Sequence, residues 1–575
     1  MIHPEYKSLI DVLDRKLFNI PEYQRHYSWQ GKQRSDLFDD IRALQEKQER
    51  FDERSHFMAT VVCLKTGTKK QLGSNTFDDY DIVDGQQRLT TLIVLLKAIS
   101  LKLKSDGQLD EAKDVDKLLV KDDGRLIILQ NNHDNHLILR YYLEYGSKPE
   151  ADTIKTAADH NLNQAIKECE KFVNAQSDVI KLLALVKHSL NFIFMSLEDK
   201  GAVYTIFEVL NSRGLDVDWL DKCKSLLMGL LYEYADENSF SRLSDELHDC
   251  WTQVYREIGL QAIQGHEIVQ FAATLKTESN AGSPLSAEEA LKHFKDDCMK
   301  PEENESKVRR IIENTNWIKE ITSCLSKLHA EKRRNAVTEI TQARLLAIAI
   351  MLRKDLDENE RERLLEQWER TTFRIYGIYR NDARIKRGDY VRVAKKIARK
   401  ETNETELLSL IAEIGKEYPV QSINAEFMKS DFYNERQKEL RYFFFRYEEY
   451  LAKLNGSQLN QIIWNEIWNA SLNNTIEHIL PQDKSKSCWN NFTDSQHKDL
   501  VHSIGNLSLL SPSLNREAWN NCFNDKKETY KKTKMLLFDE IIFTNNAERV
   551  SWDENAIIER RQNLINFALE QWKDL

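Results

Sequence analysis

The chain has 575 residues, of which 41% are hydrophobic and 30% charged, and its formal net charge is −10. This length exceeds what one hydrophobic core can hold, so several domains are expected, and no apolar run reaches the roughly 20 residues that a bilayer requires. The acidic balance disfavours a nucleic-acid binder without excluding one, because binding depends on local basic patches.

Turn-forming residues are scarce: the chain has only 18 Gly and 8 Pro. Long elements with few hairpins are therefore expected, and we predict a mainly α fold with smaller α+β parts. The first residues lack the basic-then-apolar pattern of a signal peptide. The 8 cysteines are scattered singly with no C-x-x-C pair, which disfavours a disulfide framework and predicts reduced thiols in a cytoplasmic protein.

The chain falls into three zones in order of sequence. Residues 1–225 mix strand and helix signals, with strands expected at 56–66 and 80–83 and a polar loop between them. Residues 226–435 show apolar side chains at three- and four-residue spacing, the pattern of helices. Residues 436–575 are rich in Trp, Asn and aromatic side chains, irregular over 473–524, and end in a predicted helix at 554–572.

The sharpest motif of the first zone is DIVDGQQRLTTL, residues 81–92. A short strand ends at Asp84 and Gly85, and an apolar helix follows at once. A helix start exposes free backbone N–H groups that favour an anion, and Arg88 adds a planar cationic group suited to phosphate. Gln86 and Gln87 add amide donors, and Asp84 has the chemistry to hold a metal, a water or a ribose. The spacing is not that of a P-loop.

Two further polar clusters interrupt apolar surroundings. The first, IPEYQRHYSW (20–29), places Gln24 and Arg25 among three aromatic residues. The second, FEVLNSRGL (207–215), leaves Asn211 and Arg213 where a predicted helix stops at Gly214. Each cluster alone is explained by capping or surface pairing, but the three together favour one shared site.

The last zone carries TIEHILPQ (475–482), IGNLSLL (504–510) and LNR (514–516). Phosphodiester hydrolysis needs an activated water and a cation that neutralises the phosphate. Glu477 places a hard oxygen beside the His478 imidazole, and Asn515 can return an amide oxygen to Mg²⁺. The alternative is that His478 is a structural histidine in a Trp-rich loop. His502, His497, His133 and His136 are interpreted as structural or surface residues.

Zinc is disfavoured, because the spacing of Cys488 and Cys522 with His478 fits no zinc pattern. A basic segment, 373–400, carries many Arg and Lys side chains against only Asp382 and Asp389. It is either a solvated helix face or a surface that contacts phosphates. In the second case we expect DNA contacts from Arg384, Lys386, Arg387, Lys395 and Lys396.

The three N-terminal clusters resemble the N-terminal half of the GmrSD-type (type IV) restriction endonucleases, whose DGQQR motif is similar to the ParB/sulfiredoxin-like nucleotide-binding fold. DWLDKCK (218–224) also resembles the Asp-x-x-Lys that follows in that family. The resemblance implies binding and hydrolysis of an NTP, GTP or ATP, near residues 84–88. Gln24, Arg25, Asn211 and Arg213 would then be supporting residues.

The C-terminal motifs resemble the ββα-metal, or HNH, nuclease motif in its His-Asn-Asn form. The resemblance implies that His478 is the general base, that Glu477 and Asn515 hold Mg²⁺ or Mn²⁺, and that Asn506 pins the loop. Many HNH nucleases have Asp at the position of Glu477. The zinc-knuckle cysteines of some HNH proteins are absent, so packing must hold the hairpin.

Together the two halves resemble the fused GmrSD architecture, with domains predicted at 1–225 (nucleotide-binding), 226–435 (helical, DNA-contacting) and 436–575 (nuclease). The implied function is NTP-dependent restriction of modified double-stranded phage DNA, such as glucosylated hydroxymethylcytosine DNA, by a cytoplasmic enzyme. A homodimer would supply two cuts. The alternatives are a phosphorothioate-sensing nuclease, a nucleotide-switched DNA-binding regulator with an inactive nuclease module, and an RNA-cutting effector.

Overall fold

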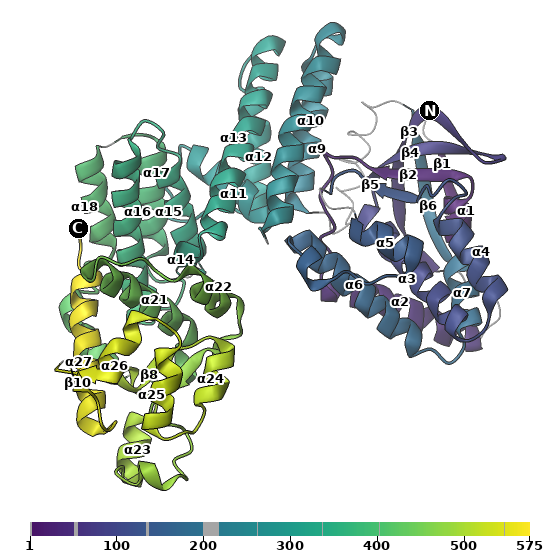
Figure 1. Cartoon of the computed structure of the whole chain (residues 1–575). Helices are drawn as coiled ribbons and strands as arrows, with labels where there is room; N and C mark the ends of the chain where they lie inside the picture. The colour runs from purple at the N-terminus through teal and green to yellow at the C-terminus, as the bar shows by residue number, and fades with distance from the viewer. Residues whose placement is uncertain are drawn as a thin grey trace. The chain divides into compact units, whose positions relative to one another are not determined.

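The computed structural model describes residues 3–50, 56–133, 137–198 and 218–575, apart from residues 262, 336, 338, 402, 430 and 546. Its contacts divide the chain into two compact units, Met1–Thr277 with Leu285–Ser326 and Glu278–Pro284 with Lys327–Leu575. Most elements are helices, with small sheets, so the predicted mainly α class with smaller α+β parts is confirmed (Figure 1). The three-domain division at 225 and 435 stays a prediction.

The first unit contains a mixed six-stranded sheet of order β1-β6-β3-β4-β2-β5. β3 lies at its centre, antiparallel to β4 and parallel to β6, while β2 runs parallel to both β4 and β5. The strands are β1 (His3–Ser8), β2 (Lys16–Ile20), β3 (His56–Leu72), β4 (Asn75–Asp84), β5 (Ile128–Gln130) and β6 (Leu190–Leu197).

The two strands expected at 56–66 and 80–83 are the cores of β3 and β4, but both extend much further toward each other. The stretch expected to be a loop is therefore mostly strand, and only a tight turn at Gly73, with φ 58°, joins the two. One face of the far half of this hairpin is exposed, while Leu72 and Phe77 on the other face pack with Leu17. The many polar residues of the exposed face suggested a loop.

One helix, α3 (Gln86–Ser105), is buried along most of its length and packs against α4, α6 and α7. Its apolar residues, Leu89 to Ile99, form the middle of the largest core cluster. This burial fixes the start of α3 at the end of β4, where the DGQQR motif lies. The other helices around the sheet are α1 (Leu9–Leu13), α2 (Gly31–Arg50), α4 (Leu109–Leu119), α5 (Leu137–Tyr145), α6 (Ala157–Asn174) and α7 (Val179–His188).

Five further helices of the described residues lie wholly or mainly in the first unit (Figure 1). The predicted helical pattern at 226–234 falls within α9, which begins at Trp219 and is capped by Asp218. These helices are α9 (Trp219–Tyr234), α10 (Glu237–Leu260), α11 (Gly265–Lys276), α12 (Ala287–Met299) and α13 (Asn304–Ala330).

The second unit begins with helices and ends with the small ribbon that carries the C-terminal motifs. Its aromatic core includes Trp572, whose ring lies 4.8 Å from Phe373 and 5.2 Å from Phe443. The main helices before the ribbon are α14 (Lys332–Asn335), α15 (Thr341–Met351), α16 (Glu358–Thr372), α17 (Arg387–Ala398), α18 (Glu404–Ile414), α19 (Ile423–Lys429), α20 (Phe432–Glu435), α21 (Gln437–Leu454) and α22 (Gln461–Asn469).

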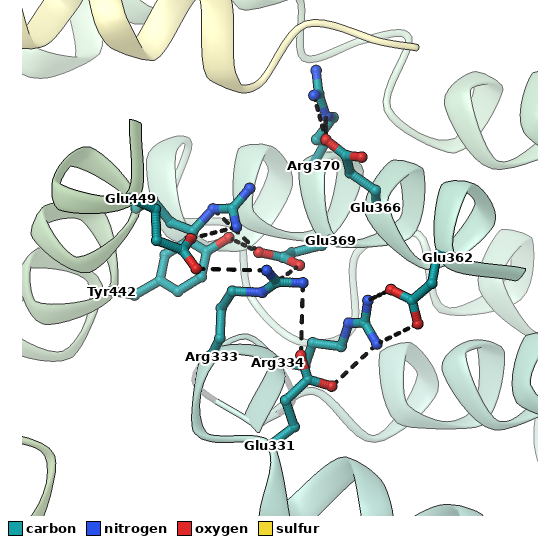
Figure 2. Close-up of polar contacts among 10 residues, drawn as sticks. Glu331, Arg333, Arg334, Glu362, Glu366, Glu369, Arg370, Tyr442 and Glu449 are labelled. Carbon is teal, nitrogen blue, oxygen red and sulfur yellow. Dashed lines mark hydrogen bonds and ion pairs between the residues drawn. The ribbon is translucent and has the colours of Figure 1, made fainter. Parts of the chain in front are cut away.

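A buried ion network holds α14, α16 and α21 together (Figure 2). The Glu369 carboxylate accepts a hydrogen bond from Tyr442 and lies 3.4 Å from Arg333 and 3.5 Å from Arg446. Burial alone would raise the pKa of Glu369, but the two guanidinium groups outweigh it and the pKa is lowered. A glutamate buried without these partners would be costly, so the network fixes the relative positions of the three helices.

In the ribbon, β7 (Ile476–His478) pairs antiparallel with β8 (Leu507–Leu509), and α24 (Pro512–Ala518) follows directly. This is the strand-strand-helix order expected for residues 475–516. The remaining elements of this part are α23 (Asp494–Leu500), α25 (Phe523–Lys531), α26 (Asp539–Ile542), β9 (Phe543–Thr544), β10 (Ala547–Glu548) and α27 (Glu554–Gln571).

No helix in the described part of the chain is both long and apolar enough to cross a membrane.

Candidate functional site

The first cluster of polar side chains lies where β4 meets α3. Gly85 is the N-cap of α3 and has φ 90°, a conformation that L side chains rarely adopt. A Cβ at this position would lie 3.2 Å from the Thr60 carbonyl oxygen and 3.2 Å from a Val61 methyl group. Only glycine fits here without strain. The Asp84 carboxylate takes the Gly85 N–H, but no side chain of the described residues caps the N–H groups of Gln86, Gln87 and Arg88, so these remain available to a ligand.

Three glutamines tie the 20–29 segment to this helix start. The Gln87 amide accepts a hydrogen bond from Ser28 N (2.8 Å) and donates one to the His26 carbonyl (2.9 Å), which makes Gln87 a structural anchor. Gln24 donates to the Val83 carbonyl (3.1 Å), and Gln86 donates weakly to Gln24 (3.5 Å). The buried Gln86 Oε1 has no hydrogen-bond partner among the described residues, so it is an acceptor left for a ligand or a water.

Arg88 and Arg25 have different environments in this cluster. Arg25 Nε lies 3.2 Å from Asp221, and this carboxylate, with Asp218, outweighs burial and raises the pKa of Arg25. Arg88 lies over the Trp29 ring at 5.5 Å, and among the residues that the structure describes no carboxylate pairs with it. Burial lowers the pKa of Arg88, and burial also raises the pKa of the neighbouring Asp84. An incompletely neutralised guanidinium of this kind suits an incoming phosphate.

The DWLDKCK segment at the start of α9 supplies side chains that were not among the predicted site residues. Lys224 Nζ donates to the Tyr23 carbonyl at 2.7 Å and lies over the Tyr23 and Tyr255 rings at 4.6 and 5.3 Å. Burial lowers the pKa of Lys224 to about 7. Asp221 accepts a hydrogen bond from the Tyr255 hydroxyl at 2.6 Å. The Asp-x-x-Lys spacing was the available signal, because residues three apart share one face of a helix.

The second cluster surrounds His478 at the end of β7. The His478 Nε2 atom lies 3.1 Å from His502 Nδ1, and Gln482 Nε2 lies 3.5 Å from His478 Nδ1. The Tyr433 ring meets the His478 ring edge-on at 4.5 Å. Burial, followed by His502, lowers the pKa of His478 to about 3, so the imidazole is neutral at neutral pH. His502 had been interpreted as a structural or surface residue, and the structure instead brings it into the site.

Glu477 does not join His478, because consecutive strand residues point to opposite faces. Its buried carboxylate accepts hydrogen bonds from Lys526 Nζ (2.7 Å) and the Tyr530 hydroxyl (2.6 Å). Lys526 also donates to the His478 carbonyl oxygen at 2.6 Å. Burial raises the pKa of Glu477 and lowers that of Lys526.

The donor set predicted for Mg²⁺ or Mn²⁺ therefore does not converge in this structure, and a metal-ligand role for Glu477 does not fit. Its carboxylate is committed to Lys526 and Tyr530. No group of three His, Cys, Asp or Glu side chains in the described ranges is arranged to hold a metal ion. No sequence signal could have shown the pairing of Glu477 with Lys526, which lie 49 residues apart.

The two predicted asparagines have distinct surroundings. Asn506 is fully buried; it accepts from Leu480 N (2.8 Å) and Trp552 Nε1 (3.1 Å) and donates to the Leu480 carbonyl (2.9 Å). These bonds close the loop between β7 and β8, the position expected of a loop pin. Asn515 uses its amide nitrogen, donating to the Asn474 and Ile476 carbonyls at 3.0 and 3.4 Å. Its amide oxygen is the atom that Asn515 could offer to a cation.

Cys488 and Cys522 form a disulfide, so the prediction of reduced thiols is wrong for this pair. The two residues are 34 positions apart, and spacing rules for cysteines do not reach that far. The bond links the loop after β7 to the start of α25, the helix that carries Lys526 and Tyr530. The other cysteines in the described ranges are not part of a disulfide.

Two family models match parts of the chain, and each match contains one of the two clusters. The model of the GmrSD restriction endonuclease N-terminal domain matches residues 6–228, and the model of the GmrSD restriction endonuclease C-terminal domain matches residues 419–567. The chain belongs to the GmrSD restriction endonuclease family. Its DNA substrate and its role in restriction follow from that membership. No curated protein matches the chain.

The first GmrSD match contains the cluster around residues 84–88, and the second contains His478, His502, Asn506, Asn515 and Lys526. Asn211 and Arg213, predicted to support the first cluster, lie outside the described residues. His136 does as well. His133 forms a contact of 3.2 Å with Asp159, which fits the structural interpretation that it was given.

The basic segment of this GmrSD protein lies in neither match, and much of its charge is neutralised. Lys395 is buried and donates to the Ser279 and Ala281 carbonyls, both at 2.9 Å, so the predicted DNA contact by Lys395 is wrong. An ammonium held inside the fold cannot reach a phosphate. Arg384 is paired with Asp382 and Lys386 with Glu417.

Three predicted DNA contacts remain accessible, because the Arg384 side chain is 87% exposed although it pairs with Asp382. Arg387 and Lys396 on α17 are exposed, and among the described residues neither has an ion-pair partner. Lys386 and Lys395 are therefore satisfied within the fold, which the sequence could not show because Glu417 and Ser279 lie far away along the chain.

Proposed function

We propose that this GmrSD endonuclease hydrolyses a nucleoside triphosphate, GTP or ATP, at the cluster around Asp84–Arg88, and that this hydrolysis licenses cleavage of modified double-stranded DNA at His478. The observation that carries the proposal is the pairing, on one chain, of a phosphate-suited helix start with a neutral, hydrogen-bonded histidine in a strand-strand-helix ribbon.

The helix start supports the nucleotide part of the proposal. The free N–H groups of α3 carry partial positive charge, and the Arg88 guanidinium adds a full charge beside them. Lys224, with a pKa of about 7, can give or take a proton near neutral pH. Arg25 is held by Asp221 and Asp218, so we assign it a positioning role rather than a direct phosphate contact.

The His478 environment supports the cleavage part. A general base must be unprotonated, and burial keeps this imidazole neutral at neutral pH. Because Nε2 faces His502, Nδ1 is the nitrogen that remains to take a proton from the attacking water. The weak contact with Gln482, at 3.5 Å, is one that a water can replace.

We also propose dependence on a divalent cation, Mg²⁺ or Mn²⁺, which when bound would neutralise charge on the scissile phosphate. With Glu477 committed to Lys526, the Asn515 amide oxygen and the oxygens of the substrate itself are the ligands that this site offers.

The substrate class that we propose is modified phage DNA, with glucosylated hydroxymethylcytosine first, in a cytoplasmic enzyme that acts as a homodimer. A phosphorothioate-sensing nuclease of the same build is the runner-up. The modification that most stimulates nucleotide turnover separates the two.

The test is an assay of purified chain with Mg²⁺ or Mn²⁺, each nucleotide in turn, and modified or plain DNA. His478→Ala should lower cleavage about 10²–10⁴-fold, as loss of a positioned general base does, while nucleotide hydrolysis stays at the wild-type rate. Arg88→Ala should lower nucleotide hydrolysis first. Normal cleavage by His478→Ala, or normal hydrolysis by Arg88→Ala, would refute the corresponding half of the proposal.

A further inference from the structure

We infer that His502 is the positioning residue of the nuclease site: its Nδ1 atom accepts a hydrogen bond from His478 Nε2 and thereby fixes the ring orientation and tautomer of the general base. The inference rests on the proposed role of His478. It concerns a residue that the catalytic motif itself does not contain.

The hydrogen-bond roles follow from the geometry. The two facing nitrogens are 3.1 Å apart, so one must carry the proton and the other the lone pair. For His478 to accept a proton at Nδ1, its neutral form must already hold a proton at Nε2. His502 Nδ1 is then the acceptor, and the remaining proton of His502 is at Nε2. A base oriented by a third group is the general logic of activated catalytic histidines.

The site is built to hold His502 in this orientation. The His502 ring stacks on the Tyr433 ring at 5.1 Å with only 9° between the planes, and the same tyrosine meets His478 edge-on at 4.5 Å. Tyr433 belongs to α20, a short helix capped by Asp431. One aromatic ring thus fixes both imidazoles, which leaves little freedom for either to rotate.

Of the charged groups that face the pair, most oppose a protonated His478, and Asp431 favours it. Asp431 attracts the protonated forms of both rings. His497, whose Nε2 lies 2.9 Å from the Pro481 carbonyl, and Lys526 oppose protonation of His478. The acceptor on His502 gives the proton at Nε2 a partner throughout, so the ring need not turn when Nδ1 receives a second proton.

A histidine that merely fills space would be replaceable by an apolar side chain of similar size, and this separates the two roles. We expect His502→Leu, which removes the acceptor and keeps bulk, to lower kcat for DNA cleavage about 10–100-fold with little change in KM, the size of loss seen for orienting partners. His502→Asn, whose amide oxygen can stand where Nδ1 stood, should recover most of the rate. His160→Ala, an exposed histidine far along the chain, is the matched control.

Wild-type cleavage by His502→Leu would overturn the inference. So would an equal loss in His502→Asn and His502→Leu accompanied by an equal drop in thermal midpoint, because that pattern marks a packing role. If His478→Ala itself cuts DNA normally, the proposed function fails first. If His478→Ala does not cleave DNA but His502→Leu cleaves it at the wild-type rate, only the inference about His502 is overturned.

A measurement on the wild-type chain tests the tautomer assignment even if the variants do not fold. Nitrogen-15 imidazole spectra of the free protein should show His478 protonated at Nε2 and His502 protonated at its own Nε2. A His478 proton at Nδ1 would contradict the assignment whatever the variants do.

Discussion

A fully buried lysine ammonium, that of Lys526, lies between the Glu477 carboxylate and the His478 carbonyl oxygen, at 2.7 and 2.6 Å. Taking both charges out of water costs several kcal/mol each, and only their mutual attraction and the Tyr530 hydrogen bond offset this cost. The pair therefore adds little net stability over an apolar pair. Loss of either Glu477 or Lys526, however, would disturb the strand position of His478.

Lys526→Met should consequently destabilise the C-terminal unit by about 3–5 kcal/mol, because it leaves an uncompensated buried carboxylate. Adding Glu477→Gln to that variant should restore much of the loss. Urea unfolding of the two single variants and the double variant measures the coupling. Additive losses would show that the two side chains do not interact.

Lys224 offers a residue-scale test in the other unit. Its pKa is lowered to about 7 by burial, against 10.5 for the ordinary side chain. Between these values the unfolded chain binds a proton that the folded chain does not, so the free energy of unfolding rises with pH in this window and falls as the pH drops from 10.5 to about 7. Below pH 7 the folded state carries the full free-energy cost of burying the charged Lys224 ammonium.

Lys224→Met removes this dependence. The unfolding free energy of the wild type relative to Lys224→Met should rise by up to about 1.4 kcal/mol per pH unit from pH 7 to pH 9. Thermal unfolding of both proteins in matched buffers measures the difference. A gap that stays constant over this range would contradict a lowered pKa.

At the scale of elements, α25 is the part that stiffens the nuclease ribbon. It carries Lys526 and Tyr530 on its inner face, and its N-cap residue, Cys522, is bonded to Cys488 in the loop after β7. A covalent link to the loop after β7 and a buried ion pair to Glu477 on β7 thus hold the same helix in place. Packing was the only support that the sequence suggested for the hairpin.

Reduction of this bond should lower the stability of the C-terminal unit by about 3–4 kcal/mol, the loop-closure effect expected for a 34-residue separation. Differential scanning calorimetry with and without a reductant tests this. Cys488→Ser should reproduce the reduced midpoint and become insensitive to reductant. A reductant effect that persists in Cys488→Ser would implicate another cysteine.

Whether a feature of the fold or site could be predicted depends on whether the residues that determine it lie close together in the sequence. The helix at 554–572, the β4–α3 junction at Gly85 and the order of the ribbon follow from periodicity and turn chemistry, and the structure has all three. The commitment of Glu477 to Lys526 and the burial of Lys395 depend on partners 49 and 116 residues away. No local pattern encodes such partners, so these failed as site predictions.

The hairpin of β3 and β4 failed for a different reason. Residues 67–72 and 75–79 are mostly polar because one face of that end is solvated, whereas Leu72 and Phe77 pack with Leu17 on the other face. Pairing with a neighbouring strand satisfies the backbone regardless of side-chain polarity. Likewise His502 was set aside because a lone histidine near a Gly-Asn turn carries no spacing signal.

On the scale of the whole molecule, a chain with net charge −10 acts on DNA, itself an anion. Long-range attraction is therefore weak, and we expect binding to depend on local exposed cations, among which Arg387 and Lys396 are candidates. Each chain also has one proposed nuclease site, at His478. Cutting both strands of a duplex then needs either two chains or a second encounter by one chain.

With one nuclease site in each chain, the proposed homodimer leads to a quantitative prediction. If each chain cuts one strand, mixtures of wild type and His478→Ala, equilibrated before DNA is added, form mixed dimers that only nick. Double-strand breaks should then fall as the square of the wild-type fraction, while total strand cleavage falls in direct proportion. The measurement is the ratio of linear to nicked circular plasmid across a series of mixtures, with plain dilution of the wild type at matched concentrations as the control. Linear product that falls only in proportion to the wild-type fraction would mean that one chain makes both cuts.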